Sequence, residues 1–328
     1  MSRDLRERAQ TLLGKVAQLR NGLRQRVIGQ DQLIDDLLVA LLAGGHVLLE
    51  GLPGLGKTLL VRSLGHGLGL EFARIQFTPD LMPSDVTGTQ VFDEEGGQRR
   101  FRFQPGPLFA GLVLADEINR ASPKTQSALL EAMQEHAVTV AGTTHALPRP
   151  FHVVATQNPI ELEGTFPLPE AQLDRFLFRL QVKTPDAAAM ARVLAETTGT
   201  PAPDLPVALR ADELAELQQL VREVLVGSHL IRFTAELVLA THPEVGDERT
   251  RRCVRYGASA RAGQAILLGA KARALLDGRP SVAREDLDAC LLPALAHRVL
   301  LSFEAEADRV DVAALLGGWI DRATRASK

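Results

Sequence analysis

Eight consecutive residues combine glycines, a lysine and a hydroxyl in a spacing suited to holding phosphate. The segment Gly51–Thr58 reads Gly-Leu-Pro-Gly-Leu-Gly-Lys-Thr and stands between an apolar run and a helical pattern. Glycines let backbone N–H groups approach phosphate oxygens, and a helix N-terminus adds partial positive charge. Lys57 would contact the β- and γ-phosphates, and the Thr58 hydroxyl would bind Mg²⁺. The pattern predicts a P-loop. The expected binding residues are Gly51, Pro53, Gly54, Leu55, Gly56, Lys57, Thr58 and Leu59.

Two acidic residues follow the apolar run 112–115 and add a second chemical group. A strand that ends in acids places them at the carboxyl edge of a parallel sheet, where ligands bind. Asp116 would hold Mg²⁺, and Glu117 would polarise the water that attacks the γ-phosphate. A base beside the metal ligand favours hydrolysis over simple phosphoryl transfer.

Three further polar residues could act on a nucleotide, but their spacing alone does not assign them a role. Asn158 follows the apolar run 151–156 and could sense the γ-phosphate, although Asn-Pro also favours a turn. Arg175 precedes another apolar run, and Arg261 lies at the start of a helical pattern. Isolated arginines in such places are usually on the surface or in salt bridges.

The elements around these residues predict two domains. Over residues 1–185, short apolar strands alternate with helices, which indicates an α/β domain with a parallel sheet. Residues 89–103 and 137–147 read as two β-hairpins inserted into this pattern. The second domain, residues 186–328, contains only helical patterns. They lie near 211–225, 230–241, 258–277, 283–300 and 308–324.

The amino-acid composition argues against a nucleic-acid partner, a disulfide-stabilised fold and insertion into a membrane. The chain has 37 Lys and Arg against 40 Asp and Glu, so it lacks the strong basic field of many nucleic-acid-binding proteins. Aromatic residues make up 4% of the chain, which disfavours both a base-stacking platform and an aromatic pore loop that grips unfolded chains. Two cysteines exclude a disulfide framework. No apolar stretch approaches the ~20 residues that span a bilayer, so we expect no membrane insertion and a cytoplasmic location.

In this order the motifs resemble the AAA+ ATPases, and within them the MoxR family. The resemblance covers nearly the whole chain and is densest between residues 27 and 182. It implies a three-layer αβα nucleotide-binding domain followed by an all-α lid. The phrases that carry it are Phe-Thr-Pro-Asp-Leu-Met-Pro-Ser-Asp (77–85), Ala-Asp-Glu-Ile-Asn-Arg-Ala (115–121), residues 124–135, residues 155–161, and Pro-Leu-Pro-Glu-Ala-Gln-Leu-Asp-Arg-Phe (167–176).

The resemblance also implies how ATP is held. Family members form hexameric rings with ATP between subunits. Asn158 then corresponds to sensor 1, and Arg175 to an arginine finger that acts on the neighbouring subunit's nucleotide. Arg261 corresponds to sensor 2, contacting ATP from the lid, and Val27 and Ile28 to the segment that packs on adenine.

The family resemblance further implies a protein-remodelling activity. Members act as chaperone-like ATPases that mature metalloenzymes or complexes, often with a partner bearing a von Willebrand A domain. The two hairpins resemble the family's helix-2 insert and pre-sensor-1 hairpin. Since motor and lid account for nearly all residues, client choice is expected to come from the hairpins, the N-terminal helix or a partner. Ala260 departs from the family's usual proline before the sensor-2 arginine.

Two other enzyme classes share the P-loop. One is a DNA-acting AAA+ ATPase, either a helicase or a transcription activator. The charge balance argues against the helicase, and the activators' Gly-Ala-Phe-Thr-Gly-Ala loop is absent, although Arg99, Arg100 and Arg102 leave a local basic patch. The other class is a small-molecule P-loop kinase or a GTPase. Glu117 and a lid carrying Arg261 argue against it.

Overall fold

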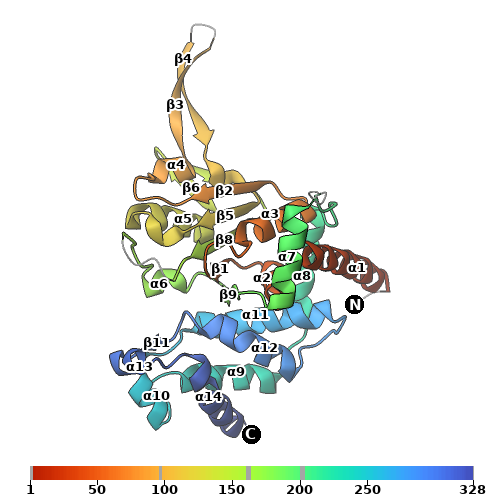
Figure 1. Ribbon diagram of the computed structural model, residues 1–328, viewed down its shortest axis with the longest axis vertical. Coiled ribbons are helices and arrows are strands. Elements are labelled where there is room, and N and C mark those ends of the chain that lie inside the picture. Colours follow the sequence, from red (N-terminus) through yellow and green to blue (C-terminus); the bar gives the residue numbers. More distant parts are fainter. Residues whose placement is uncertain (1–2, 96–97, 160–163, 200–203, 328) are drawn as a thin grey trace.

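The computed structural model describes residues 3–95, 98–159, 164–199 and 204–327. A five-stranded sheet lies in the order β2-β5-β8-β1-β9, and all of its pairings are parallel (Figure 1). This confirms the predicted α/β domain. The strands are β1 (Val47–Glu50), β2 (Phe72–Gln76), β5 (Leu112–Asp116), β8 (His152–Gln157) and β9 (Phe178–Gln181).

Helices cover both faces of this sheet because the buried strands are apolar on both sides. Along β5, Leu112 and Leu114 join one hydrophobic core, whereas Val113 and Ala115 join another on the opposite face. The first core contains side chains of α1, α2 and α3, and the second those of α4 and α5. These helices are α1 (Arg3–Arg26), α2 (Asp31–Leu42), α3 (Lys57–Gly67), α4 (Pro83–Thr87) and α5 (Pro123–Glu135).

Both predicted hairpins form. In Figure 1 the first hairpin, β3 with β4, projects from the α/β domain as a long two-stranded ribbon. Its predicted Gly96-Gly97 turn lies outside the described residues. The second hairpin is shorter. Its first strand, β6, follows α5 in the chain and contacts that helix. The strands are β3 (Gly88–Glu95), β4 (Gln98–Pro105), β6 (Ala137–Val140) and β7 (Thr143–Ala146).

The C-terminal part of the chain is a helical lid, as predicted, with one addition. Two short strands form an antiparallel pair that the helical patterns did not indicate. The expected domain boundary at 185/186 falls in the connection between β9 and α7. The lid elements are α7 (Ala187–Thr198), α8 (Ala211–Glu223), α9 (Ser228–Ala240), α10 (Glu248–Cys253), β10 (Val254–Tyr256), α11 (Ala260–Leu276), α12 (Arg284–Leu295), β11 (Leu300–Leu301), α13 (Phe303–Ala307) and α14 (Ala313–Ala326).

Lid and sheet are joined by a continuous apolar core. Phe178 of β9 and Leu37 of α2 belong to the same buried cluster as Ile266 of α11 and Leu291 of α12. Apolar surface removed from water on this scale favours a fixed arrangement of the two parts. Over the described part of the chain, no helix combines the length and apolar character needed to cross a membrane.

Candidate nucleotide-binding site

The P-loop connects β1 to α3, and its glycines serve two structural needs. Gly54 and Gly56 have φ angles of 80° and 79°, a left-handed conformation that favours glycine. A Cβ atom at either position would meet no other atom within 4 Å, so the space above the loop is open. Gly51 instead lies against β9's end, where a Cβ would approach the Val182 side chain to 2.8 Å.

The start of α3 leaves backbone donors available. Gly56 is the N-cap residue and provides no side-chain hydrogen bond to the helix. Lys57 extends its ammonium group back over the loop and donates to the Gly51 carbonyl. Partial burial lowers the pKa of Lys57, while the nearby Asp116 and Glu117 carboxylates act in the opposite direction. Uncapped N–H groups beside an ammonium suit an anionic ligand such as phosphate.

The predicted acids lie where β5 ends, and a neighbouring strand fixes both of them. The Thr156 hydroxyl of β8 donates to Asp116 Oδ1 at 2.6 Å and accepts the Glu117 N–H at 2.8 Å. Glu117 has a φ of 56°, a left-handed conformation that costs free energy in a residue with a side chain. Hydrogen bonding from Thr156 therefore supports a strained turn that separates the two carboxylates.

Three donors contact these acids and were missing from the sequence-based site. Arg74 of β2 contacts Asp116 Oδ2 through Nη2 at 2.7 Å. Gln76 and Arg120 donate to Glu117 Oε2 at 2.8 and 2.9 Å. The alternation in β2 was a usable signal, because its polar residues Arg74 and Gln76 share one face of the strand. What the sequence did not indicate was that β2 lies next to β5.

These groups surround a cavity of about 390 Å³. Asn158, just beyond β8, reaches the same cavity and is buried. Thr58 and Asp116 both line it, and hydroxyl and carboxylate oxygens are ligands that Mg²⁺ accepts alongside phosphate and water. The lining residues are Pro53, Gly54, Gly56, Lys57, Thr58, Leu59, Arg74, Gln76, Asp116, Glu117 and Asn158. Gly51 and Leu55 complete the loop without lining the cavity.

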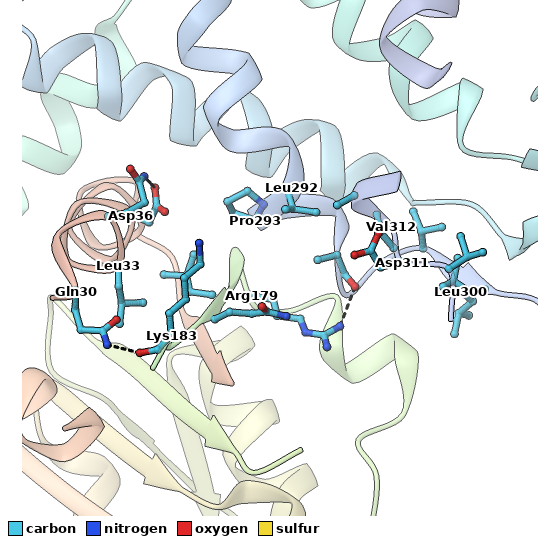
Figure 2. Close-up of a pocket in the computed structure, with 18 of the residues that line it drawn as sticks. Gln30, Leu33, Asp36, Arg179, Lys183, Leu292, Pro293, Leu300, Asp311 and Val312 are labelled. Atoms are coloured by element: carbon cyan, nitrogen blue, oxygen red, sulfur yellow. Dashed lines mark hydrogen bonds between the residues drawn. The ribbon is translucent and has the colours of Figure 1, made fainter. Parts of the chain in front are cut away.

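The adenine-contact candidates lie outside this cavity. Val27 and Ile28 follow α1 directly and are both buried. The turn that contains them is tied to the sheet because the Gln30 amide donates to the Lys183 carbonyl at 2.7 Å. A second cavity of about 580 Å³ opens beside this turn, between α2, β9 and the lid (Figure 2). It shares no lining residue with the P-loop cavity.

The two arginine candidates meet at another place, which we call the Asp174 corner. It comprises Asp174, Arg175, Ser259, Arg261 and Arg298. The Asp174 carboxylate accepts from the Ser259 hydroxyl at 2.9 Å and from Arg298 Nε at 2.7 Å, and Arg261 Nη1 lies 3.9 Å away. Neither Arg175 nor Arg261 lines the P-loop cavity of its own chain. Arg261 thus lies near the residue that precedes Arg175, and neither arginine lines the cavity that contains Lys57.

Comparison with known proteins agrees with the motifs and the fold. Residues 46–178 match the ATPase family associated with various cellular activities (AAA), and residues 246–316 match the AAA lid domain. Chaperone MoxR1 of Mycobacterium tuberculosis is 43% identical over 290 residues, which cover 88% of this chain and 76% of the relative. Protein MoxR of Methylorubrum extorquens is 31% identical over 90% of each chain.

A solved structure extends the likeness to three dimensions. A crystal structure of a Cytophaga hutchinsonii protein superposes with a TM-score of 0.90 at 36% identity, over 97% of both chains. The match therefore includes the lid as well as the sheet. Together these relatives cover both the α/β domain and the helical lid. The chain belongs to the MoxR family of AAA ATPases.

Proposed function

We propose that this protein is an ATP-hydrolysing motor that assembles as a hexameric ring and remodels a protein client together with a von Willebrand A domain partner. One observation carries the mechanism. The P-loop cavity collects Lys57, Thr58, Asp116 and Glu117, whereas Arg175 lies outside it in the same chain. Relatives named chaperone MoxR1 and MoxR support the remodelling role.

Within one chain, the residues around the cavity divide the work. Lys57 and the α3 N-terminus would bind the phosphates, and Asn158 would contact the γ-phosphate. The Thr58 hydroxyl and the Asp116 carboxylate would hold Mg²⁺, whose charge would neutralise that of the phosphates. Glu117 would orient and polarise the attacking water, and its donors Gln76 and Arg120 hold its carboxylate in place.

Two further positive charges, Arg175 and Arg261, would come from the neighbouring subunit of the ring. Arg175 follows Asp174 in the chain, and Arg261 Nη1 lies 3.9 Å from the Asp174 carboxylate, so both arginines would act on the next subunit's γ-phosphate. An arginine supplied by a partner neutralises charge that develops during phosphoryl transfer. Sensor 2 therefore acts between subunits in this proposal, rather than on the ATP of its own chain.

Concentration dependence tests whether the site is shared. Phosphate release per subunit is measured over a dilution series with ATP and with GTP, without any acceptor. We expect turnover per subunit to rise with protein concentration as rings form, and ATP to be preferred. Constant turnover down to concentrations at which only monomers exist would overturn the shared site. Phosphate transfer that requires a small-molecule acceptor would indicate a kinase instead.

The projecting hairpin offers a contact for the client. Phe92 of β3 and Phe101 of β4 face each other across the strands, with ring centroids 5.5 Å apart. Their exposed fractions are 57% and 68%, so both rings are available to a partner. The low aromatic content of the chain therefore does not prevent two aromatic residues from lying together at one exposed place. Aromatic residues are enriched in protein contacts.

A trapping experiment tests both client and partner. Glu117→Gln protein, loaded with ATP, should retain a von Willebrand A domain protein and a client from cell lysate. Adding Phe92→Ser and Phe101→Ser should release the client. Val91→Ser on the hairpin's other face serves as the control and should not. If the Phe variants retain the client as well as the control does, the hairpin is not the contact.

The alternative function, a DNA-acting ATPase, would require DNA to bind the basic patch of the β3–β4 hairpin. On the same hairpin, Arg102 Nε lies 3.4 Å from Asp93, so its charge is partly neutralised, and the Arg99 side chain lies outside the described residues. Turnover should not change when DNA is added at low salt. Stimulation that declines steeply with salt would instead support a DNA-acting motor.

A further inference from the structure

Arg298 directs its hydrogen bonds to the segment that carries Arg175. It lies just beyond α12 and is 9% exposed. Its Nε contacts the Asp174 carboxylate at 2.7 Å, and its Nη2 donates to the carbonyls of Asp174 and Phe176 at 3.1 and 2.6 Å. Its Nη1 donates to the Leu177 carbonyl at 3.0 Å. A single lid side chain, which is itself held by the Ala294 carbonyl at 2.6 Å, thus contacts Asp174, Phe176 and Leu177 on either side of Arg175.

The preceding lid residue strengthens this attachment. His297 Nε2 lies 2.9 Å from the Phe176 carbonyl, which can only accept, so the ring must carry its proton there. Burial lowers the pKa of His297 well below its usual range, and the positive charge of Arg298 acts in the same direction. The ring is therefore neutral near pH 7. His297 Nε2 and Arg298 Nη2 therefore both donate to the Phe176 carbonyl.

A second part of the lid reaches the same segment from α11. The Ser259 hydroxyl donates to Asp174 Oδ2 and also accepts the Arg261 N–H at the start of that helix. Phe176, in turn, is completely buried in the core beneath the sheet. The segment is therefore held at one end by the core and on its polar side by two lid helices.

Stability alone does not account for this arrangement. Buried ion pairs contribute little net stability because desolvation offsets their attraction. Arg279 provides a contrast, since its side chain is partly exposed and it pairs with Asp286 and Asp277 of the lid itself. Arg298 instead spans lid and core, and it does so at the residues on either side of Arg175.

We propose that Arg298, assisted by His297, is a positioning residue that attaches Arg175 to the lid. The lid then fixes the backbone on both sides of Arg175, so the orientation of the finger toward the neighbour's nucleotide depends on this lid contact. This inference rests on the proposed function of Arg175. It assigns no direct contact with ATP to Arg298.

Hydrogen exchange tests the attachment itself, without reference to turnover. The full-length chain with Arg298→Lys keeps the charge but loses the guanidinium fork. Amides 175–177 should exchange about tenfold faster or more, because charge-assisted hydrogen bonds are removed. Arg279→Lys, the matched control, should leave these amides unchanged. Equal exchange in wild type and Arg298→Lys would overturn the proposal.

Mixed rings test the consequence for the finger. Arg298→Lys should lower kcat about tenfold or more with ATP affinity within about twofold of wild type, and Arg279→Lys should retain turnover. Adding Lys57→Ala subunits, which supply an intact finger, should restore turnover. Arg175→Ala mixed in the same way is the benchmark. If the benchmark recovers and Arg298→Lys does not, the positioning role is wrong. If Arg175→Ala alone keeps wild-type turnover, the finger assignment fails, and the exchange result still decides the attachment.

Discussion

The P-loop cavity and the Asp174 corner contrast in how they are built. The cavity forms at one edge of the sheet, where β1, β5 and β8 end side by side. Lys57, Asp116 and Asn158 each follow or end a strand, so the parallel order alone brings them together. The cavity combines open space above two left-handed glycines with an uncapped helix start.

The Asp174 corner joins segments that are far apart in the chain. Asp174, Ser259 and Arg298 come from the stretch before β9 and from two places in the lid. The corner concentrates cationic side chains but shares no residue with the cavity that could hold phosphate. Under the proposed function, these two regions would be half-sites, and each would supply what the other lacks.

The largest effect is expected at the corner. Arg175→Ala should lower turnover by about 10³- to 10⁵-fold, the range of an arginine finger in trans. Binding of a fluorescent ATP analogue should stay within about twofold, because the cavity of the same chain is intact. If affinity for the ATP analogue fell as much as turnover, Arg175 would belong to the site of its own chain. The contrast between the cavity and the corner would then be wrong.

Glu117→Gln should give the next largest effect, this time within the cavity. Turnover should fall by about 10²- to 10⁴-fold, since the amide cannot accept a proton from water. Gln76 and Arg120 contact the Glu117 carboxylate, not the phosphate-binding loop, so ATP binding should persist. Single-turnover hydrolysis and equilibrium binding separate the two quantities. Near-normal hydrolysis would show that another group activates the water.

Acidic pH should lower the stability of the fold, partly because of His297, the residue that precedes Arg298 of the corner. The pKa of His297 is lowered in the folded chain, so below about pH 6.5 the unfolded state binds a proton that the folded state does not. The stability that neutral His297 contributes above that pH is therefore lost as pH falls. Urea unfolding of His297→Gln should show a correspondingly smaller difference between pH 7 and pH 5. An unchanged difference would mean that His297 titrates normally.

Other buried histidines provide an internal comparison for that measurement. Burial lowers the pKa of His46 to about 3 and that of His152 to about 4. Both stay in the His297→Gln variant, so part of the pH dependence should remain. Their partners lie in the α/β domain and α8, away from the corner.

The smallest effect is expected at Thr156, which supports the cavity without lining it. Thr156→Val removes the hydrogen bonds to Asp116 and to the Glu117 N–H while keeping the side-chain shape. Turnover should fall about tenfold. Thr156→Ser keeps the hydroxyl and should retain most of the activity. Equal loss in both variants would point to packing, not to hydrogen bonding.

The cavity was largely predictable because its residues follow local rules. A glycine-rich turn before a helix and acids after an apolar strand identify themselves within a few residues, as Lys57 and Asp116 do. Arg74 escaped prediction because the pairing of β2 with β5 is not encoded in the spacing along the chain. Strand order depends on the packing of the whole domain.

The corner was less predictable for the same reason. Arg298 lies 124 residues from Asp174, and the pattern around it indicates only the end of a helix. The sequence predicted an α/β domain and a helical lid, but it did not show that one apolar core continues from the sheet into the lid. Exposure of Phe92 and Phe101 could not follow from the number of aromatic residues, because composition carries no information about position.

The central claim is that the Asp174 corner of one chain completes the P-loop cavity of the next. Mixing Arg175→Ala with Lys57→Ala subunits tests it most directly, once mass measurements show that mixed rings form. Each variant alone should be inactive, and mixtures should regain turnover, because an intact cavity can then meet an intact finger. Absence of recovery at every ratio would contradict the claim.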